Sequence, residues 1–305
     1  MPLFTGVVPP VVTPLNPDFT VDFASFEAAL NHLVDAGVHG VFVLGSTGEV
    51  VFHDAEIRAR IIDHAIKTVA GRVPVLVGAI DMTTDRVISH ARTAASAGAD
   101  AVVVTAPFYT RTNQAETIDH FHYVREAVDL PVVGYDIPVC VGMKLTRDTI
   151  NTLARDGTLA GLKDSSGDDA ALRYVLSDLK DLDGFFGMTG SEIMVDTALS
   201  MGAHGVVPGL ANVDPHGYVE LWNKVQAGDL TGARQVQERL CRLFEIVWIA
   251  AGRTSAGAAG VGSFKTAMRE MGIIATNTMA RPARLLNDDE TAKIRAILGA
   301  SGLIG

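Results

Sequence analysis

The chain has 305 residues and a formal net charge of −10, and hydrophobic residues make up 48% of it. This composition supplies a large core and excludes disorder, while the acidic balance without a basic cluster argues against nucleic-acid partners and anionic membrane surfaces. Two cysteines, Cys140 and Cys241, are too few for a disulfide scaffold. We find neither a signal peptide nor an apolar run of membrane-spanning length, so we expect a cytoplasmic protein.

Short valine-rich runs recur along the chain, each after a segment with helical spacing. Ala36-Gly37, Ala97-Gly98 and Met201-Gly202 open three of these runs. A helix, a glycine stop and a fully apolar strand are the alternation of a parallel sheet. The predicted strands are 6–12, 39–44, 74–79, 101–105, 131–135, 159–163, 184–188 and 204–208. The predicted helices are 22–36, 53–70, 83–97, 114–128, 146–155, 168–180, 191–201 and 213–226.

Eight βα units in series favour an α/β fold with a closed (β/α)8 TIM barrel, and an open doubly wound sheet is the alternative. The strand signal stops after about residue 227. Helices are expected at 229–251, 255–272 and 288–299. We therefore expect a barrel over 1–227 and a C-terminal helical extension over 228–305 that packs on it.

The active sites of (β/α)8 barrels lie at the carboxyl ends of the strands, which limits the search to eight loops. After the second predicted strand comes Gly45-Ser46-Thr47-Gly48-Glu49. Its glycines permit a tight turn, and its hydroxyls and amides can hold a carboxylate. A plain tight turn would have the same sequence.

Two further strands end on reactive side chains. Tyr135 ends the fifth strand, where its phenol can relay a proton, although a packing aromatic is the alternative. Lys163 ends the sixth strand after Leu159-Ala160-Gly161-Leu162. Burial favours the neutral form of an amine, which Schiff-base chemistry with a carbonyl requires. A surface lysine one residue past the strand is the alternative.

The loops after the last two strands would form the other wall of the barrel mouth. They contain Thr189-Gly190-Ser191-Glu192 and Pro208-Gly209-Leu210. Ser191 is predicted to be a helix N-cap. His120 and His122 stand two residues apart on a predicted helix, so they should diverge rather than share a metal.

Three motifs together carry a family resemblance. Gly45-Ser46-Thr47-Gly48-Glu49, Tyr135-Asp136-Ile137-Pro138 and Gly161-Leu162-Lys163-Asp164-Ser165-Ser166-Gly167-Asp168 follow the second, fifth and sixth strands. In this order they resemble the dihydrodipicolinate synthase / N-acetylneuraminate lyase family, and the resemblance runs from Phe4 to about Leu286. It implies class I aldolase chemistry on a small-molecule 2-keto acid, a homotetramer built as a dimer of dimers, and neither metal nor organic cofactor.

The resemblance also implies roles for individual residues. Lys163 would form a Schiff base with C2 of pyruvate or another 2-keto acid, and Tyr135 would shuttle protons. Ser46 and Thr47 would hold the pyruvate carboxylate. Tyr109 would complete a proton relay with Ser46 and Tyr135, in some members across a subunit interface. The other implied substrate-binding positions are Gly48, Ser165, Gly190, Glu192, Val207 and Gly209.

Departures from the family pattern bear on the second substrate. Dihydrodipicolinate synthases usually carry Gly-Arg-Thr soon after the tyrosine motif, whereas residues 139–144 here read Val-Cys-Val-Gly-Met-Lys. Asp136 replaces the common asparagine, and Lys144 offers only a point charge in place of the arginine. Sialic-acid lyases commonly place a serine near Gly209, and none is present.

We therefore expect aldol cleavage or condensation of a sialic acid or a 2-keto-3-deoxy sugar acid, as in N-acetylneuraminate lyase. The first alternative is 4-hydroxy-tetrahydrodipicolinate (dihydrodipicolinate) synthase, which condenses pyruvate with aspartate semialdehyde. The second is a sugar-acid dehydratase. An alternative of another class is a non-catalytic barrel that binds carboxylates.

Overall fold

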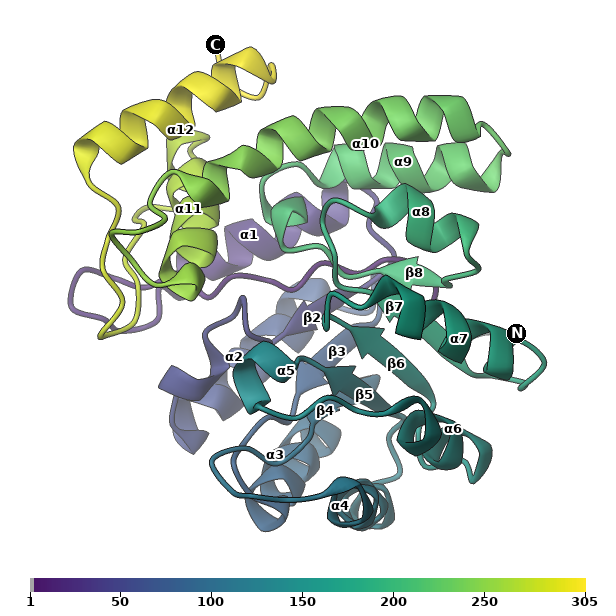
Figure 1. Cartoon of the computed structure of the whole chain (residues 1–305). Helices are drawn as coiled ribbons and strands as arrows, with labels where there is room; N and C mark the ends of the chain where they lie inside the picture. The colour runs from purple at the N-terminus through teal and green to yellow at the C-terminus, as the bar shows by residue number, and fades with distance from the viewer. Residues whose placement is uncertain (1–2) are drawn as a thin grey trace.

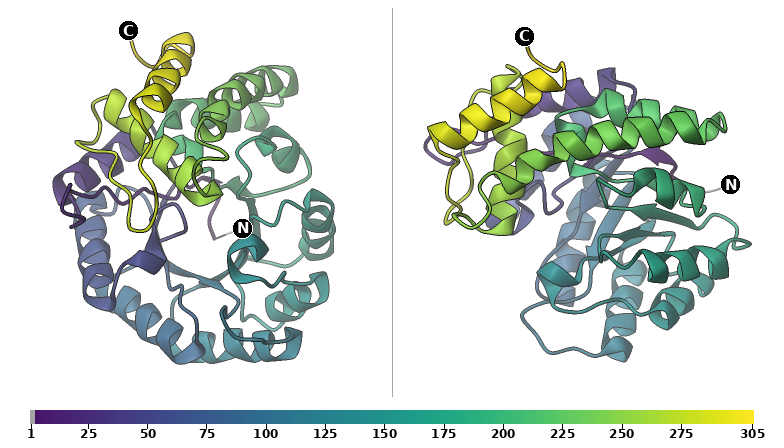
Figure 2. Two further views of the ribbon diagram at one scale, coloured as in Figure 1. Left: turned by 60° about the vertical axis from the view of Figure 1, so that its left-hand side comes forward. Right: turned by 45° about the horizontal axis from the view of Figure 1, so that its top comes forward.

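The computed structural model describes residues 3–305, in which eight parallel strands lie inside a ring of helices (Figures 1 and 2). Hydrogen-bonded neighbours follow the order β1-β8-β7-β6-β5-β4-β3-β2. The strands are β1 (Gly6–Val7), β2 (Val41–Val43), β3 (Val75–Gly78), β4 (Ala101–Thr105), β5 (Val132–Asp136), β6 (Gly161–Asp164), β7 (Phe186–Thr189) and β8 (Gly205–Val206).

The sheet closes between its first and second strands. The backbone N–H of Val11 donates to the Phe42 carbonyl at 2.8 Å, and the N–H of Phe42 donates to the Pro9 carbonyl at 2.9 Å. These bonds join the residues after β1 to β2. The predicted (β/α)8 barrel is therefore confirmed, and the open sheet is wrong.

A helix follows each strand, as the alternation of apolar runs and glycine stops predicts. Asp22 caps α1 by accepting the N–H of Ser25, and Thr146 caps α6 by accepting the N–H of Thr149, at the residues where the predicted helices 22–36 and 146–155 begin. These helices are α1 (Phe23–Asp35), α2 (Ala55–Val69), α3 (Thr84–Ala97), α4 (Gln114–Ala127), α6 (Arg147–Arg155), α7 (Asp169–Leu179), α8 (Val195–Ser200) and α9 (Pro215–Gln226). Shorter turns are η1 (Val50–Phe52), α5 (Pro138–Val141) and η2 (Gly209–Asn212).

The C-terminal part contains α10 (Leu230–Phe244), η3 (Glu245–Trp248), α11 (Ala256–Glu270) and α12 (Asp288–Ala300). These helices lie together along one side of the barrel (Figure 2, left). The predicted helix 229–251 is wrong beyond Phe244, because the chain tightens into a 3₁₀ turn there. The hydroxyl of Ser263 donates to the Ile246 carbonyl at 2.8 Å, a contact 17 residues away in the chain. None of the helices within residues 3–305 is both long and apolar enough to cross a membrane.

A glycine in β3 makes room for the turn that leaves β2. A Cβ added to Gly78 would lie 1.9 Å from the backbone oxygen of Leu44, and Leu44 has the left-handed φ of 56°. We expect Gly78→Ala to lower the free energy of unfolding by about 1–3 kcal/mol in urea denaturation, because backbone cannot yield as a side chain can.

The matched control is Gly257→Ala in α11. A Cβ at Gly257 meets nothing within 4 Å, and its φ is not positive. Alanine there should raise the free energy of unfolding, by at most about 1 kcal/mol. Equal unfolding free energies for the two variants would show that Gly78 has no such steric role.

Candidate active site

The reactive lysine and tyrosine lie side by side in the barrel. Tyr135 of β5 stands in register with Lys163 of β6. The Lys163 Nζ lies 3.8 Å from the centroid of the Tyr135 ring and 5.0 Å from that of Phe42 in β2. Since β2 is distant from β5 and β6 in the sheet order, these three side chains meet in the barrel interior. Lys163 is 5% exposed and Tyr135 is 3% exposed, so neither is a surface residue.

The loop after β2 comes to the same point. The Ser46 hydroxyl lies 3.4 Å from the Tyr135 hydroxyl, with either able to donate. Ser46 is exposed, Thr47 is partly exposed and Gly48 is buried. The Ser46 hydroxyl of this loop therefore joins the cluster that Tyr135 forms with Lys163.

The turn that carries Ser46 is strained at both ends. Leu44 and Glu49 have φ angles of 56° and 54°, in the left-handed region that disfavours residues with a Cβ. Each such residue costs on the order of 1–3 kcal/mol, which surrounding contacts must offset. Gly45 is required between them, because a Cβ there would lie 2.6 Å from the Phe42 ring.

Tyr109 is not part of this cluster within one chain. It lies between β4 and α4, is 97% exposed, and has a φ of 62°. No hydrogen bond joins it to Ser46 or Tyr135 in the described residues. The relay suggested by the resemblance is therefore incomplete within a single copy of the chain.

The predicted opposite wall is built from the loops after β6, β7 and β8. The N–H of Gly190 donates to the Asp164 carbonyl at 2.6 Å, and a Cβ on Gly190 would lie 2.0 Å from the Ser165 hydroxyl oxygen. The N–H of Val207 donates to the Thr189 carbonyl at 2.8 Å. Ser165, Gly190 and Val207 thus lie at adjacent strand ends, as expected.

Glu192 is the carboxylate of this wall. Its Oε1 accepts the N–H of Gly209 at 3.0 Å, and a Cβ on Gly209 would lie 2.8 Å from the Phe264 ring. Burial raises the pKa of Glu192, while the Gly209 N–H and the charge of Lys163 act in the opposite direction. Glu192 therefore presents a partly buried acidic group near the lysine.

The prediction that Ser191 caps a helix over 191–201 is wrong, because α8 begins only at Val195. Gln237 of α10 supplies the cap instead: its Oε1 accepts the N–H of Val195 at 2.9 Å. Its Nε2 donates to the Glu192 carbonyl at 3.0 Å, and the Tyr218 hydroxyl donates to the same carbonyl at 3.0 Å. These contacts hold the segment before α8 in an irregular conformation that no local pattern reveals.

Lys144 forms an ion pair with Asp136. Its Nζ donates to Oδ2 of Asp136 at 2.6 Å, and the Leu145 N–H donates to Oδ1 at 3.0 Å. Asp136 is fully buried, so its carboxylate needs these partners. Burial raises the pKa of the neighbouring Asp164, and the negative charge of Asp136 raises it further. Lys144 therefore neutralises Asp136 and is a poor substitute for the arginine of dihydrodipicolinate synthases.

Cys140, which the sequence patterns do not single out, also lies at the site. Cys140 is exposed, in the short helix α5 that follows β5. Partial desolvation raises the pKa of its thiol, while Ser46 and the charge of Lys163 act in the opposite direction. The sequence signal that could have located it is its place two residues after Pro138, in the segment leaving the Tyr135 strand.

The mouth continues outward along α11. A cavity of about 360 Å³ has Ser46, Arg253 and Arg284 among its lining residues. A second cavity, of about 380 Å³, is lined by Glu192. The two share three lining residues at or near the start of α11, namely Thr254, Gly257 and Val261. The start of α11 thus separates the Ser46 side of the mouth from the Glu192 side.

Potential metal ligands are dispersed. Residues 3–305 contain no group of three His, Cys, Asp or Glu side chains that could hold a metal ion together. His120 lies 3.0 Å from the Thr84 hydroxyl, whereas His122 lies 2.9 Å from the carboxylate of Asp156. Burial lowers the pKa of His120 to about 4. The predicted divergence of the two histidines is confirmed.

Comparisons with known proteins agree with this geometry. Residues 3–301 match the sequence profile of the Dihydrodipicolinate synthetase family. A 4-hydroxy-tetrahydrodipicolinate synthase of Methanosphaerula palustris is 34% identical, over 81% of this chain and 85% of the relative. An uncharacterized DapA-like lyase of Halobacterium salinarum is 36% identical, over 98% and 94%.

Solved structures are similar over almost the whole chain. YagE, a prophage protein of the dihydrodipicolinic acid synthase family from E. coli K12 crystallised with pyruvate, has a TM-score of 0.92 at 30% identity, covering 99% of this chain and 100% of that one. Dihydrodipicolinate synthase of Bacteroides thetaiotaomicron has a TM-score of 0.92 at 30% identity, covering 98% and 99%.

Proposed function

Because the chain belongs to the dihydrodipicolinate synthetase family, we propose that Lys163 forms a Schiff base with the C2 carbon of pyruvate. Members of this family are Schiff-base-dependent lyases and synthases, and the chain is a class I pyruvate-dependent aldolase. The observation that carries the residue assignment is the buried Lys163 amine, packed over the ring of Tyr135 at the carboxyl end of β6.

The arrangement supports each step of the reaction. The neutral amine of Lys163 adds to C2 of pyruvate, and the resulting carbinolamine takes up one proton and loses water to give an iminium. The iminium withdraws electrons from C3, so that carbon loses a proton and the resulting enamine attacks an aldehyde carbon. Cleavage is the reverse sequence. Tyr135 is placed to transfer protons, and Ser46, 3.4 Å away, to pass them on.

The loop after β2 is the best candidate to hold the pyruvate carboxylate. Ser46 and Thr47 supply hydroxyls, and the tight turn through Gly48 brings backbone N–H groups to the same place. The overall charge of −10 does not prevent this, since local donors rather than net charge contact the ligand.

Names of the relatives favour aspartate semialdehyde as the acceptor. The Methanosphaerula palustris relative is called 4-hydroxy-tetrahydrodipicolinate synthase, and similar structures are called dihydrodipicolinate synthase. On this ground the leading proposal is condensation of pyruvate with aspartate semialdehyde. Arg284, which lines the Ser46 cavity and makes no ion pair within residues 3–305, is the cation placed to attract the acceptor's carboxylate, whereas Arg253 is paired with Glu290.

A second proposal is cleavage of a sialic acid or a 2-keto-3-deoxy sugar acid. Two observations favour it: Lys144 is paired with Asp136, and Glu192 offers a carboxylate that can accept hydrogen bonds from sugar hydroxyls. A carboxylate-bearing acceptor would be repelled by Glu192 if it lay on that side of the mouth.

A substrate panel separates these reactions. Wild-type protein is incubated with pyruvate and aspartate semialdehyde, and pyruvate consumption is followed; in parallel, pyruvate release is followed from N-acetylneuraminate and from 2-keto-3-deoxygluconate. The leading proposal expects consumption in the first mixture only. Release from a sugar acid with no consumption in the first mixture would replace it by the second proposal. A panel without any turnover, and without pyruvate trapping at Lys163, would leave a carboxylate-binding barrel.

We also propose that Tyr109 acts in the site of a second copy, within the homotetramer that the resemblance implies. A tyrosine that is 97% exposed and held at a φ of 62° fits a residue that is buried by another subunit. Tyr109→Ala and Lys163→Ala chains, each inactive alone, should regain activity when they are co-expressed. Each mixed pair then contains one site with an intact lysine and an intact partner tyrosine.

The expected recovery is about a quarter of the wild-type activity per subunit for random pairing into two-fold dimers. Lys163→Ala mixed with Ser46→Ala is the control, since both residues belong to the same chain's site and a mixed pair therefore contains no intact site. Failure of the Tyr109 mixture to recover, with mixed oligomers confirmed by mass spectrometry, would overturn the role of Tyr109 in the site of a second copy.

A further inference from the structure

The carboxylate-binding loop is tied to the C-terminal helices by a buried ion pair. Glu49 closes the loop after β2, and Lys265 lies in α11, 216 residues along the chain. Oε2 of Glu49 accepts a hydrogen bond from Nζ of Lys265. The side chains are 3% and 0% exposed, so water does not screen their attraction.

The pair has further partners on both sides. Oε1 of Glu49 accepts the N–H of Ala280 at 2.8 Å, and Nζ of Lys265 also donates to the Thr278 carbonyl at 3.0 Å. One carboxylate and one ammonium therefore connect the loop to α11 and to the segment after it. The buried charges are each satisfied by a partner of opposite charge and by backbone.

Movement of Glu49 would be passed directly to the hydroxyls of the loop. The N–H of Glu49 donates to the Ser46 carbonyl at 3.1 Å. On the other side, the Thr13 hydroxyl donates to the Gly48 carbonyl at 2.9 Å. Glu49 also keeps its left-handed φ of 54° without a glycine's freedom, so its conformation depends on the side chain being held.

We propose that the Glu49–Lys265 pair is a positioning pair: it fixes the loop so that Ser46 and Thr47 meet the pyruvate carboxylate. α11 then belongs to the support of the active site, and a barrel without it would bind pyruvate poorly. The inference rests on the proposed Schiff base at Lys163 and adds the residues that set pyruvate affinity. Neither Glu49 nor Lys265 touches the reacting atoms.

The alternative role is purely structural, and charge-neutral replacement separates the two. Removing one partner alone leaves a buried charge unpaired, so Lys265→Met by itself is expected to unfold the protein. The double variant Glu49→Gln/Lys265→Met removes both charges and keeps an oxygen acceptor for the Ala280 N–H. Buried ion pairs replaced in this manner often leave stability unchanged.

The experiment measures the rate at which borohydride traps the adduct at Lys163 as pyruvate is increased. For the double variant we expect the pyruvate concentration at half-maximal trapping to rise about tenfold, because the loop donors are displaced. The maximal trapping rate should change by less than about twofold, because Lys163 itself is untouched. Circular dichroism and thermal melting report whether the fold is retained.

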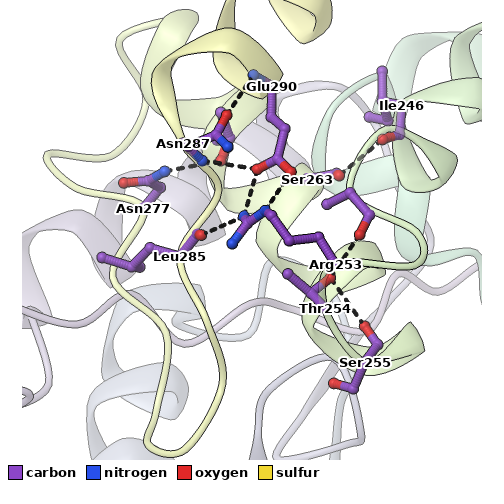
Figure 3. Close-up of polar contacts among 11 residues, drawn as sticks. Ile246, Arg253, Thr254, Ser255, Ser263, Asn277, Leu285, Asn287 and Glu290 are labelled. Atoms are coloured by element: carbon purple, nitrogen blue, oxygen red, sulfur yellow. Dashed lines mark hydrogen bonds and ion pairs between the residues drawn. The ribbon is translucent and has the colours of Figure 1, made fainter.

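The matched control breaks a different ion pair in the same region. Arg253 Nη2 and Nε lie 2.5 and 2.6 Å from the carboxylate of Glu290, which also accepts the N–H of Asn287 (Figure 3). These contacts hold the start of α12 and do not reach the loop after β2. Glu290→Gln should therefore leave the pyruvate dependence of trapping unchanged.

An unchanged pyruvate dependence in the folded double variant would overturn the positioning role while leaving Lys163 in place. Equal shifts in the double variant and in Glu290→Gln would also overturn it, because a general loosening of the C-terminal helices would then be enough. Absence of any adduct in wild-type protein would overturn the Schiff base itself, and this inference with it.

Discussion

Replacement of Lys163 by arginine is expected to abolish turnover, with a loss greater than about 10⁴-fold in kcat. Arginine keeps a positive charge that can lie over the Tyr135 ring, now 3.8 Å from the lysine Nζ. A guanidinium is always protonated, however, and has no lone pair to attack C2 of pyruvate. The variant therefore separates nucleophilic chemistry from charge. Initial rates of pyruvate consumption and release provide the measurement.

Lys163→Ala is the companion variant, and a melting temperature close to that of the wild type would show that loss of activity is not loss of fold. Retention of more than about 1% of wild-type turnover by Lys163→Arg would mean that the positive charge, rather than the amine, is what the reaction uses.

Replacement of Tyr135 by phenylalanine is expected to lower kcat by about 10²–10³-fold. The ring remains, so its packing against Lys163 and against Phe42, whose centroid lies 6.2 Å away, is preserved. Only the hydroxyl that lies 3.4 Å from Ser46 is lost. The variant should fold normally but move protons slowly to and from C3.

Exchange of the pyruvate methyl protons with deuterium, followed by NMR in D₂O, isolates this proton transfer from the acceptor. Ser46→Ala is the graded control and should slow exchange less, because Tyr135 keeps its hydroxyl and water can replace that of serine. Wild-type exchange by Tyr135→Phe would exclude the phenol as the proton carrier.

The barrel could be predicted from local patterns because the βα units repeat one pattern: a helix, a glycine that ends it and an apolar strand. Gly37, Gly98 and Gly202 have φ angles of 85°, 89° and 97°, the left-handed values that stop a helix before the next strand. The predicted strand 101–105 matches β4 at both ends, Ala101 and Thr105. Placement of Tyr135 and Lys163 followed from counting strands, since parallel strands bring their carboxyl ends together.

What local patterns missed depends on contacts between distant residues. Gln237 accepts the N–H of Val195 at the start of α8, Lys144 donates to Asp136, and Lys265 donates to Glu49. No repeating pattern in the sequence indicates such pairings, because each joins two segments that come together only in the folded chain. Tyr109 is a further case, since its proposed partners belong to a second copy of the chain.

The most direct test of a Schiff base at Lys163 is mass spectrometry after incubation with pyruvate and borohydride. We expect a single added mass of about 72 Da, which corresponds to pyruvate joined through a reduced Schiff base, on the peptide that contains Lys163. Folded protein that stays unmodified, or that carries the added mass on another lysine such as Lys144, would contradict it.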